Sequence, residues 1–396
     1  MELQAILRTL CSARESDGPI VTLTLEVAQA RFPPSAKAFL RNAVQGRYDS
    51  TEDSTASRET LKSISERVGQ YAESELHSEA QGLFLVVGDH TWQPVQLPVP
   101  MRNFIHVGRL PYVAPLLEAA MQTPRAYVLK YDHLEGVVED FEGDTWREVD
   151  RIPSAAVKRD AEHKSSRRAA LGRTGTRRTG GGMGGGGRDR FERHFEDATE
   201  AMLVQCAARV VSLQKRAPSE AIYAFGDREH FPFFRDHLAP GLRSQAIHVG
   251  PLPHRHEDLL RQAVRREVGR LTKERVDRAI MEFRDRRSEG CCVALGPSEV
   301  LPLLDTGKVS QVFIDAYDPL MGGECSDCGA LYDGDRERCD PCGKALVVAS
   351  MTQEVVARSV LHPPLPITFV PRSESWLKEL GGMAALLSKK ALRTKR

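Results

Sequence analysis

The sequence predicts a three-domain chain of the α/β and α+β classes, with mixed sheets flanked by helices and a cysteine ribbon inserted in the C-terminal domain. Three observations predict this organisation. The chain has 396 residues, more than one hydrophobic core usually organises. Strand-like apolar runs alternate with amphipathic helical segments along most of its length. Four of its eight cysteines fall between positions 325 and 342.

Composition and charge narrow the class of protein. Hydrophobic residues make up 41% of the chain and charged residues 28%, as in ordinary folded proteins. The net charge is +1, from 55 Lys and Arg against 54 Asp and Glu, so any charged surface is local. Apolar runs stay short of the roughly 18 to 20 residues that span a bilayer, and the first residues do not form a secretory signal. We expect a cytoplasmic protein with no membrane partner.

The first predicted domain covers residues 1–124. Apolar residues at helical or strand spacing predict its elements in this order: a helix over 3–10, a strand over 20–27, a helix over 60–79, a strand over 83–87 and a short helix over 115–121. Three prolines, Pro94, Pro98 and Pro100, lie between the last two elements. We expect them to interrupt regular structure there.

The second predicted domain covers residues 125–252. Its expected elements are strands over 126–129 and 134–141, a helix over 191–215, and strands over 221–225 and 245–249. The last two strands are joined by an aromatic segment over 230–238. Between the strand pair and the helix the composition changes abruptly, which marks a long loop inside the domain.

This Gly-rich basic loop spans about residues 158–193. It contains eleven Lys or Arg against four Asp or Glu, with nine glycines between positions 172 and 187. A low-complexity linker is one interpretation. The other is RNA binding, because glycines let the backbone approach a ligand and arginines bind phosphate. The candidate RNA-binding residues are Arg167, Arg168, Arg173, Arg177, Arg178, Arg188 and Arg190. A nucleotide-binding P-loop is not indicated, since no Gly-Lys-Ser/Thr follows the glycines.

The third predicted domain covers residues 253–396. Its expected elements are helices over 257–287, 298–304 and 352–361, and strands over 291–295, 311–315 and 367–370. We expect Cys291 and Cys292 to begin an apolar strand in the core. His254, His256 and Glu257 are possible metal ligands or a base, although capping and surface roles are more common at a helix start. The tail 389–396 carries five basic and no acidic residues, and a solvated terminus is favoured over phosphate contact.

The cysteine window is the most specific motif. Cys325-x2-Cys328 and Cys339-x2-Cys342 are separated by ten residues, and glycine follows each pair at Gly329 and Gly343. This spacing predicts a zinc ribbon over 322–346, in which the glycines let backbone amides point at the sulfurs. A partly degenerate site and redox use of the thiols are the alternatives. Four thiolates close the coordination sphere, so we expect zinc to be structural.

The order of these features resembles the archaeo-eukaryotic class I release factor superfamily, which includes Pelota and bacterial members. The most specific local match is the segment 376–387 (WLKELGGMAALL), and the segment 304–314 (LDTGKVSQVFI) is also similar to the family. The resemblance implies that the middle domain enters the ribosomal peptidyl-transferase centre or another site at the tRNA acceptor end. The glycine loop would then lie at its tip.

The catalytic motif of the superfamily is not preserved. Release factors carry Gly-Gly-Gln in this loop, whereas no glutamine occurs here between Gln122 and Gln205. Met183 cannot donate an N–H, but glycine amides still can. The loop candidates for catalysis are Gly180, Gly181, Gly182, Met183, Gly184 and Gly185, and the catalytic residues are otherwise unknown. Peptidyl-tRNA hydrolysis or tRNA cleavage is therefore left open. The first domain also lacks an Asn-Ile-Lys-Ser run, so stop-codon reading is not expected.

Three functional hypotheses follow. The leading one is a ribosome- or tRNA-associated translation factor that acts in ribosome rescue or peptidyl-tRNA processing through the Gly-rich loop. Its partners would be the ribosome and tRNA, with no DNA. The second is a non-catalytic ribosome-binding adaptor, such as a hibernation or quality-control factor. The third is a zinc-ribbon protein unrelated to translation.

Overall fold

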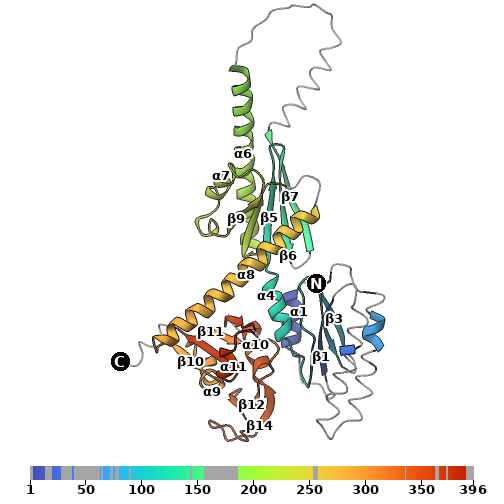
Figure 1. Ribbon diagram of the computed structural model, residues 1–396, viewed down its shortest axis with the longest axis vertical. Coiled ribbons are helices and arrows are strands. Elements are labelled where there is room, and N and C mark those ends of the chain that lie inside the picture. The colour runs from blue at the N-terminus through green and yellow to red at the C-terminus, as the bar shows by residue number, and fades with distance from the viewer. Residues whose placement is uncertain are drawn as a thin grey trace, which may run out of the picture. The chain divides into compact units, whose positions relative to one another are not determined.

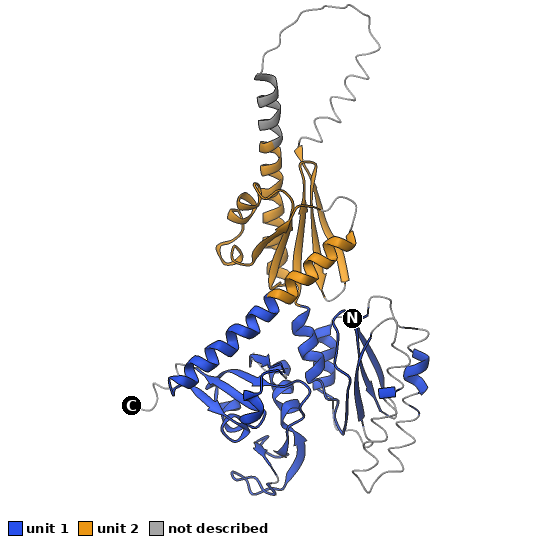
Figure 2. Ribbon diagram, viewed as in Figure 1, with its two compact units in different colours: residues 1–123, 271–396 blue, residues 124–270 orange. Residues whose placement is uncertain are grey.

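The computed structural model describes residues 3–13, 20–27, 38–39, 63, 66–71, 75, 80–88, 91–142, 145–155, 186–252, 257–334, 336–361, 365–371 and 373–388. The chain forms two compact units (Figure 2). Unit 1 comprises residues 1–123 and 271–396, and unit 2 comprises residues 124–270. Unit 1 thus contains described parts of both predicted outer domains. The division into three domains stays a prediction.

The N-terminal part of unit 1 is built around an antiparallel sheet of order β3-β2-β1-β4 (Figure 1). Its elements are α1 (Leu3–Cys11), β1 (Ile20–Glu26), β2 (Gly82–Val87), β3 (Trp92–Leu97), β4 (Phe104–Gly108) and α4 (Ala114–Gln122). The expected interruption is wrong for Pro94, which lies within β3, whereas Pro98 and Pro100 follow the end of that strand as expected. That strand is at the edge of the sheet, where a residue without an N–H is tolerated.

The C-terminal part of unit 1 holds a mixed sheet and a smaller antiparallel one. The mixed sheet has the order β10-β16-β11-β15, with β11 parallel to β15 and β16 antiparallel to its neighbours. The small sheet has the order β13-β12-β14 and is inserted between β11 and α10. The elements are β10 (Val293–Leu295), α9 (Pro297–Val300), the 3-10 helix η2 (Leu301–Thr306), β11 (Val309–Ile314), β12 (Met321–Cys325), β13 (Leu331–Asp333), β14 (Leu346–Ser350), α10 (Met351–Leu361), β15 (Ile367–Phe369), α11 (Trp376–Glu379) and β16 (Met383–Leu387).

One hydrophobic core joins these two parts of unit 1. Tyr112 and Leu116, from the N-terminal part, belong to the same buried cluster as Val312 and Val355 from the C-terminal part. The ring of Phe104 also meets that of Tyr317 edge-on, with centroids 5.6 Å apart. Burial of this shared apolar surface stabilises the pairing of segments that are far apart in the sequence.

Unit 2 contains a mixed sheet of order β7-β6-β5-β8-β9. The strands β5, β8 and β9 are parallel, while β6 and β7 extend the sheet as antiparallel strands. The elements are β5 (Ala126–Tyr131), β6 (Glu135–Glu142), β7 (Thr145–Pro153), α6 (Gly186–Arg216), β8 (Ala221–Phe225), α7 (Phe231–Asp236), the 3-10 helix η1 (Pro240–Leu242), β9 (Ala246–Gly250) and the first part of α8 (Glu257–Ser288). The mixed sheets flanked by helices predicted from the sequence are therefore present.

The structure bears on two further expectations, for the aromatic segment 230–238 and for the helix over 60–79. The aromatic segment 230–238, expected as a connection, contains helix α7, in which Phe234 is buried against the sheet. Most of the helix expected over 60–79 lies outside the described residues, although residues 66–71 are helical. None of the helices that the structure describes is long and apolar enough to cross a membrane.

Candidate metal centre and the loop-bearing unit

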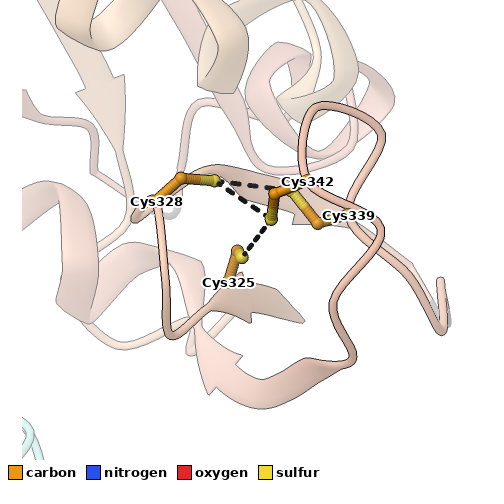
Figure 3. Close-up of side chains that lie close together, drawn as sticks. All are labelled: Cys325, Cys328, Cys339 and Cys342. Carbon is orange, nitrogen blue, oxygen red and sulfur yellow. Dashed lines mark hydrogen bonds between the residues drawn. The ribbon is translucent and has the colours of Figure 1, made fainter.

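The four cysteines of the ribbon converge. Their sulfurs all lie within 4.8 Å of one another (Figure 3). Cys325 Sγ is 3.3 Å from Cys342 Sγ, and Cys328 Sγ is 3.4 Å from Cys339 Sγ. A tetrahedral ion with metal–sulfur bonds of about 2.3 Å needs sulfurs roughly 3.8 Å apart. The donor set and its spacing therefore fit one four-coordinate metal ion, and the cluster can form a zinc ribbon.

Each cysteine pair sits on a tight backbone turn of the same design. The Gly329 N–H donates to the Cys325 carbonyl at 2.8 Å, and the Gly343 N–H donates to the Cys339 carbonyl at the same distance. Gly329 and Gly343 have φ of 68° and 71°, a conformation that glycine adopts without strain. The backbone N–H groups of Ala330 and Lys344 bond to the sulfurs of Cys328 and Cys342 and act to lower the pKa of these thiols, but hydrogen bonds to the other cysteines outweigh them and raise both pKa values. The expected orientation of amides toward sulfurs is thus observed.

Side chains outside the cysteine pairs support the cluster. Burial alone would raise the pKa of the Cys339 thiol, but a hydrogen bond from Tyr332 and others from the cluster lower it to about 6. The Tyr332 oxygen is 3.5 Å from Cys339 Sγ and also accepts the Asp340 N–H. Arg358 of α10 donates to the Gly329 carbonyl at 2.5 Å and to Asp305 at 2.6 Å. Such contacts fix the donor atoms before a metal ion binds.

In the sequence of unit 2, the Gly-rich loop lies between β7 and α6. Strand β7 ends at Pro153, and α6 begins at Gly186. Helix α6 has 31 residues, which corresponds to about 46 Å. Its C-terminal half buries Met202, Cys206 and Val210 against the sheet. A long helix, packed against the sheet through its C-terminal half, therefore follows the loop in the sequence.

Ion pairs strengthen the strands from which the loop departs. Arg125, the residue before β5, donates two hydrogen bonds to the carboxylate of the buried Asp140 in β6, at 2.9 and 2.5 Å. Arg147 of β7 donates a third to the same carboxylate at 3.1 Å. Arg209 of α6 pairs with Asp150 of β7 at 2.9 Å. These contacts connect β5, β6, β7 and α6 around the base of the loop. They were missed in the sequence because their partners come from different strands and a helix, and nothing local in the sequence shows which charges meet.

The loop itself lies largely outside the described residues. This holds for the candidate catalytic residues 180–185 and for Arg167, Arg168, Arg173, Arg177 and Arg178. Arg188 and Arg190 fall on the first turns of α6, whose backbone is described. His254, His256 and the tail 389–396 also lie outside the described residues, and Glu257 is the first residue of α8.

The core role expected for the vicinal cysteines is wrong. Cys291 is exposed and Cys292 is only partly buried, and β10 begins after both of them. Cys292 adopts φ of 60°, which is unusual for a residue with a side chain. The chain turns here between α8 and β10, so neither side chain enters the sheet.

Comparison with known families identifies the class of the loop-bearing part. Residues 111–270 match the sequence model of a release factor family. This segment, which includes α4 and all of unit 2 from β5 onward, is therefore a domain of the archaeo-eukaryotic release factor superfamily, as the sequence resemblance predicts. The family matched is bacterial archaeo-eukaryotic release factor family 10. No curated protein matches the chain.

Several solved structures are similar to the chain at low identity. One is the archaeal translation termination factor aRF1, with 13% identity, 98% of each chain covered and a TM-score of 0.24. Another is Dom34 of S. cerevisiae, with 9% identity, 98% of this chain and 93% of that chain covered and a TM-score of 0.40. A third is Pelota of Archaeoglobus fulgidus, with 15% identity, 77% and 78% covered and a TM-score of 0.31.

Proposed function

We propose that the chain is a cytoplasmic translation factor of the release-factor type, which acts on ribosomes or tRNA in rescue or peptidyl-tRNA processing. The observation that carries the proposal is the position of the Gly-rich basic loop inside the segment 111–270 that matches the release factor family. Arginines flanking glycines suit close contact with RNA phosphates. The packed helix α6 and the ion-paired strands would position this loop.

The loop would enter an RNA-lined cavity at the tRNA acceptor end. A deletion of residues 180–187 tests this, in an assay with purified stalled ribosome complexes and resolved products. Release of peptide from intact tRNA supports ester hydrolysis, and a shortened tRNA 3′ end supports cleavage. Either activity should disappear in the deletion variant, while its thermal unfolding stays unchanged. Activity retained by the variant would exclude the role of the loop.

A second candidate function is a binding-only adaptor, which the residue after Gly181 and Gly182 favours. Met183 occupies the position of the glutamine that the superfamily resemblance implies, and a thioether cannot donate a hydrogen bond. Met183→Gln distinguishes the two functions. If the loop reaches the reacting ester without performing chemistry, the variant should gain peptide release that wild type lacks. Met183→Leu is the matched control and should behave as wild type.

Ribosome association has its own test. Contacts between arginine and phosphate release counterions, so binding should weaken steeply as salt rises. We expect co-sedimentation with ribosomes at about 50 mM salt and its loss at several hundred millimolar. Failure to co-sediment at low salt would favour a zinc-ribbon protein unrelated to translation.

We also propose that the ribbon binds zinc in a structural role. Zinc suits four thiolates at tetrahedral spacing, and a four-thiolate site has no open position for substrate. When bound, the ion would cross-link the two cysteine turns. Cys325, Cys328, Cys339 and Cys342 would hold it.

A further inference from the structure

A groove runs along one face of the second half of α8. It has a volume of about 670 Å³ and lies wholly within unit 1. Its lining residues come from four turns of the helix and the turn that follows: Glu274, Asp277, Arg278, Met281, Glu282, Asp285, Arg286, Glu289, Cys291 and Cys292. It is separate from the cysteine ribbon and from the loop-bearing unit.

The groove is acidic with one apolar position. Five of its lining side chains are carboxylates and two are arginines, a difference of three negative charges. Arg286 is already engaged, because it donates to Glu282 at 2.5 Å. Met281, midway along the groove, is 62% exposed. A complementary segment would therefore be basic with an apolar residue near its middle.

The opposite face of α8 is the one that packs. Ile280 and Phe283 belong to a buried cluster, in which the Phe283 ring stacks on Trp376 with centroids 4.8 Å apart. Among the described residues, the β10-β16-β11-β15 sheet and Trp376 thus cover one face of this helix segment. Met281 lies on the opposite face and is exposed. Methionine is flexible and is used often at surfaces that bind varied partners, so Met281 offers an apolar contact to a segment that the charges attract.

Strand β16, the last strand of the chain described, ends beside one end of this groove. The Leu387 N–H donates to the Cys292 carbonyl at 2.8 Å, and Arg286 donates to the Leu387 carbonyl at 3.1 Å. Cys292 and Arg286 both line the groove. The segment 389–396 (KKALRTKR) therefore starts beside it, with five basic residues, no acidic residue and Leu392 near its middle.

The length of the groove and the length of the extended tail agree. From Glu289 back to Glu274 the helix rises about 22 Å, and eight extended residues reach about 26 Å. Leu392 lies four residues after Ser388, a reach of about 13 Å. Met281 lies eight residues before Glu289, a rise of about 12 Å. The apolar residue of the tail therefore matches the apolar position of the groove when the tail runs antiparallel to α8.

We propose that the basic tail 389–396 docks in the acidic groove of α8 within the same chain, with Leu392 on Met281. The docked tail masks its own positive charge, and nucleic acid phosphate would compete with the groove for it. Because ion pairs at a surface are screened by salt, docking weakens as ionic strength rises.

Photo-cross-linking of the full chain tests the docking without any ribosome. A benzophenone amino acid replaces Leu392, and mass spectrometry maps the adducts after irradiation at about 20 mM salt. The expected adduct joins position 392 to residues 274–292, with Met281 as the main site. Adducts concentrated elsewhere in the chain would overturn the proposal.

Charge reversal supplies the specific control. Asp277→Lys combined with Asp285→Lys should lower the adduct yield at least fivefold, and a further Lys390→Glu with Arg393→Glu should restore it. Glu379→Lys, an exposed change on α11 outside the groove, should leave the yield unchanged. Circular dichroism checks that each variant is folded. Equal yields in all variants would overturn the proposal, as would adducts between isotope-labelled and unlabelled chains, which indicate a second copy as the occupant.

Discussion

The backbone N–H of Val113 donates a hydrogen bond of 2.7 Å to Oε1 of Gln353, a residue 240 positions further along the chain. Val113 immediately precedes α4, and Gln353 lies in the first turn of α10. Both residues are buried. This bond shows directly that the N-terminal and C-terminal segments of unit 1 share one interior.

Gln353→Ala should destabilise unit 1. A buried N–H without its acceptor costs about 1 to 3 kcal/mol, in addition to the lost packing. Urea unfolding of the full chain measures the change. Gln4→Ala, the same substitution on an exposed face of α1, is the matched control and should change stability by less than about 0.5 kcal/mol. Equal effects of the two substitutions would contradict the role of this bond.

Glu118 of α4 should make stability depend on pH. Desolvation raises the pKa of its carboxyl to about 7, an effect that Arg102 opposes and Asp315 reinforces. The folded state therefore keeps a proton that the unfolded state loses above about pH 4.5, so stability falls as pH rises from about 4.5 to 7. The loss is on the order of 2 to 3 kcal/mol. Glu118→Gln should remove this part of the slope in urea unfolding measured across that range. Glu379→Gln, an exposed control, should leave the slope as in wild type.

Asp140 of β6 should matter more than a surface ion pair of the same sheet. Asp140→Asn leaves the guanidinium of Arg125 without its charged partner in a mostly buried site, which costs about 3 to 5 kcal/mol. Arg151, which pairs with Glu135 and Glu148 at an exposed position, provides the comparison. Arg151→Ala should cost less than about 1 kcal/mol. Chemical unfolding measures the free energy of unfolding of both variants. A larger loss for Arg151→Ala than for Asp140→Asn would contradict the prediction.

Gly382 should resist substitution because two constraints combine there. Its φ is 85°, and an added Cβ would lie 2.7 Å from a methyl carbon of Leu320. Gly382→Ala should therefore destabilise by about 2 to 3 kcal/mol. Gly307 has φ of 66° and open space for a Cβ, so Gly307→Ala isolates the backbone cost of about 1 kcal/mol. Thermal unfolding that shifted equally for both would exclude the steric contribution.

Removal of the metal should unfold the ribbon. Cys328→Ser should lower bound zinc from one per chain toward zero, measured by atomic emission, and lower the thermal midpoint of the full chain by several degrees. A strong chelator should produce the same shift in wild type. Cys291→Ser, which changes an exposed cysteine outside the cluster, should keep full zinc content. A zinc-free wild-type protein would exclude the proposed ion.

The sequence predicted elements best where burial alone sets the pattern. The all-buried runs of β2 and β8 and the helical spacing in α10 were found with bounds within about two residues. Among the strands that escaped prediction, β7 and β3 did so for different reasons. In β7 every residue is exposed or half-buried and the apolar residues are three positions apart, so the alternation typical of a strand is absent. In β3, Pro94 signals a break, and only the position of the strand at the sheet edge makes it acceptable.

Functional and titrating residues also differ in how far the sequence predicts them. The four cysteines were identifiable because ligand spacing is local in the sequence. Glu118 and Asp315 were not, because positions almost 200 residues apart come together only through the shared core of unit 1. The acidic face of α8 has the charge pattern of an ordinary solvated helix, and the sequence gives no sign that β16 ends beside Cys292.

The interruption of unit 1 by unit 2 has a consequence for biosynthesis. Unit 2 has emerged from the translating ribosome once residue 270 is free, whereas unit 1 needs β16 between β10 and β11, and β16 ends at Leu387. Until then the nascent N-terminal sheet has no partner for the core residues Tyr112 and Leu116. Since domains fold as they emerge, this half keeps its apolar core surface exposed while more than 250 further residues are made.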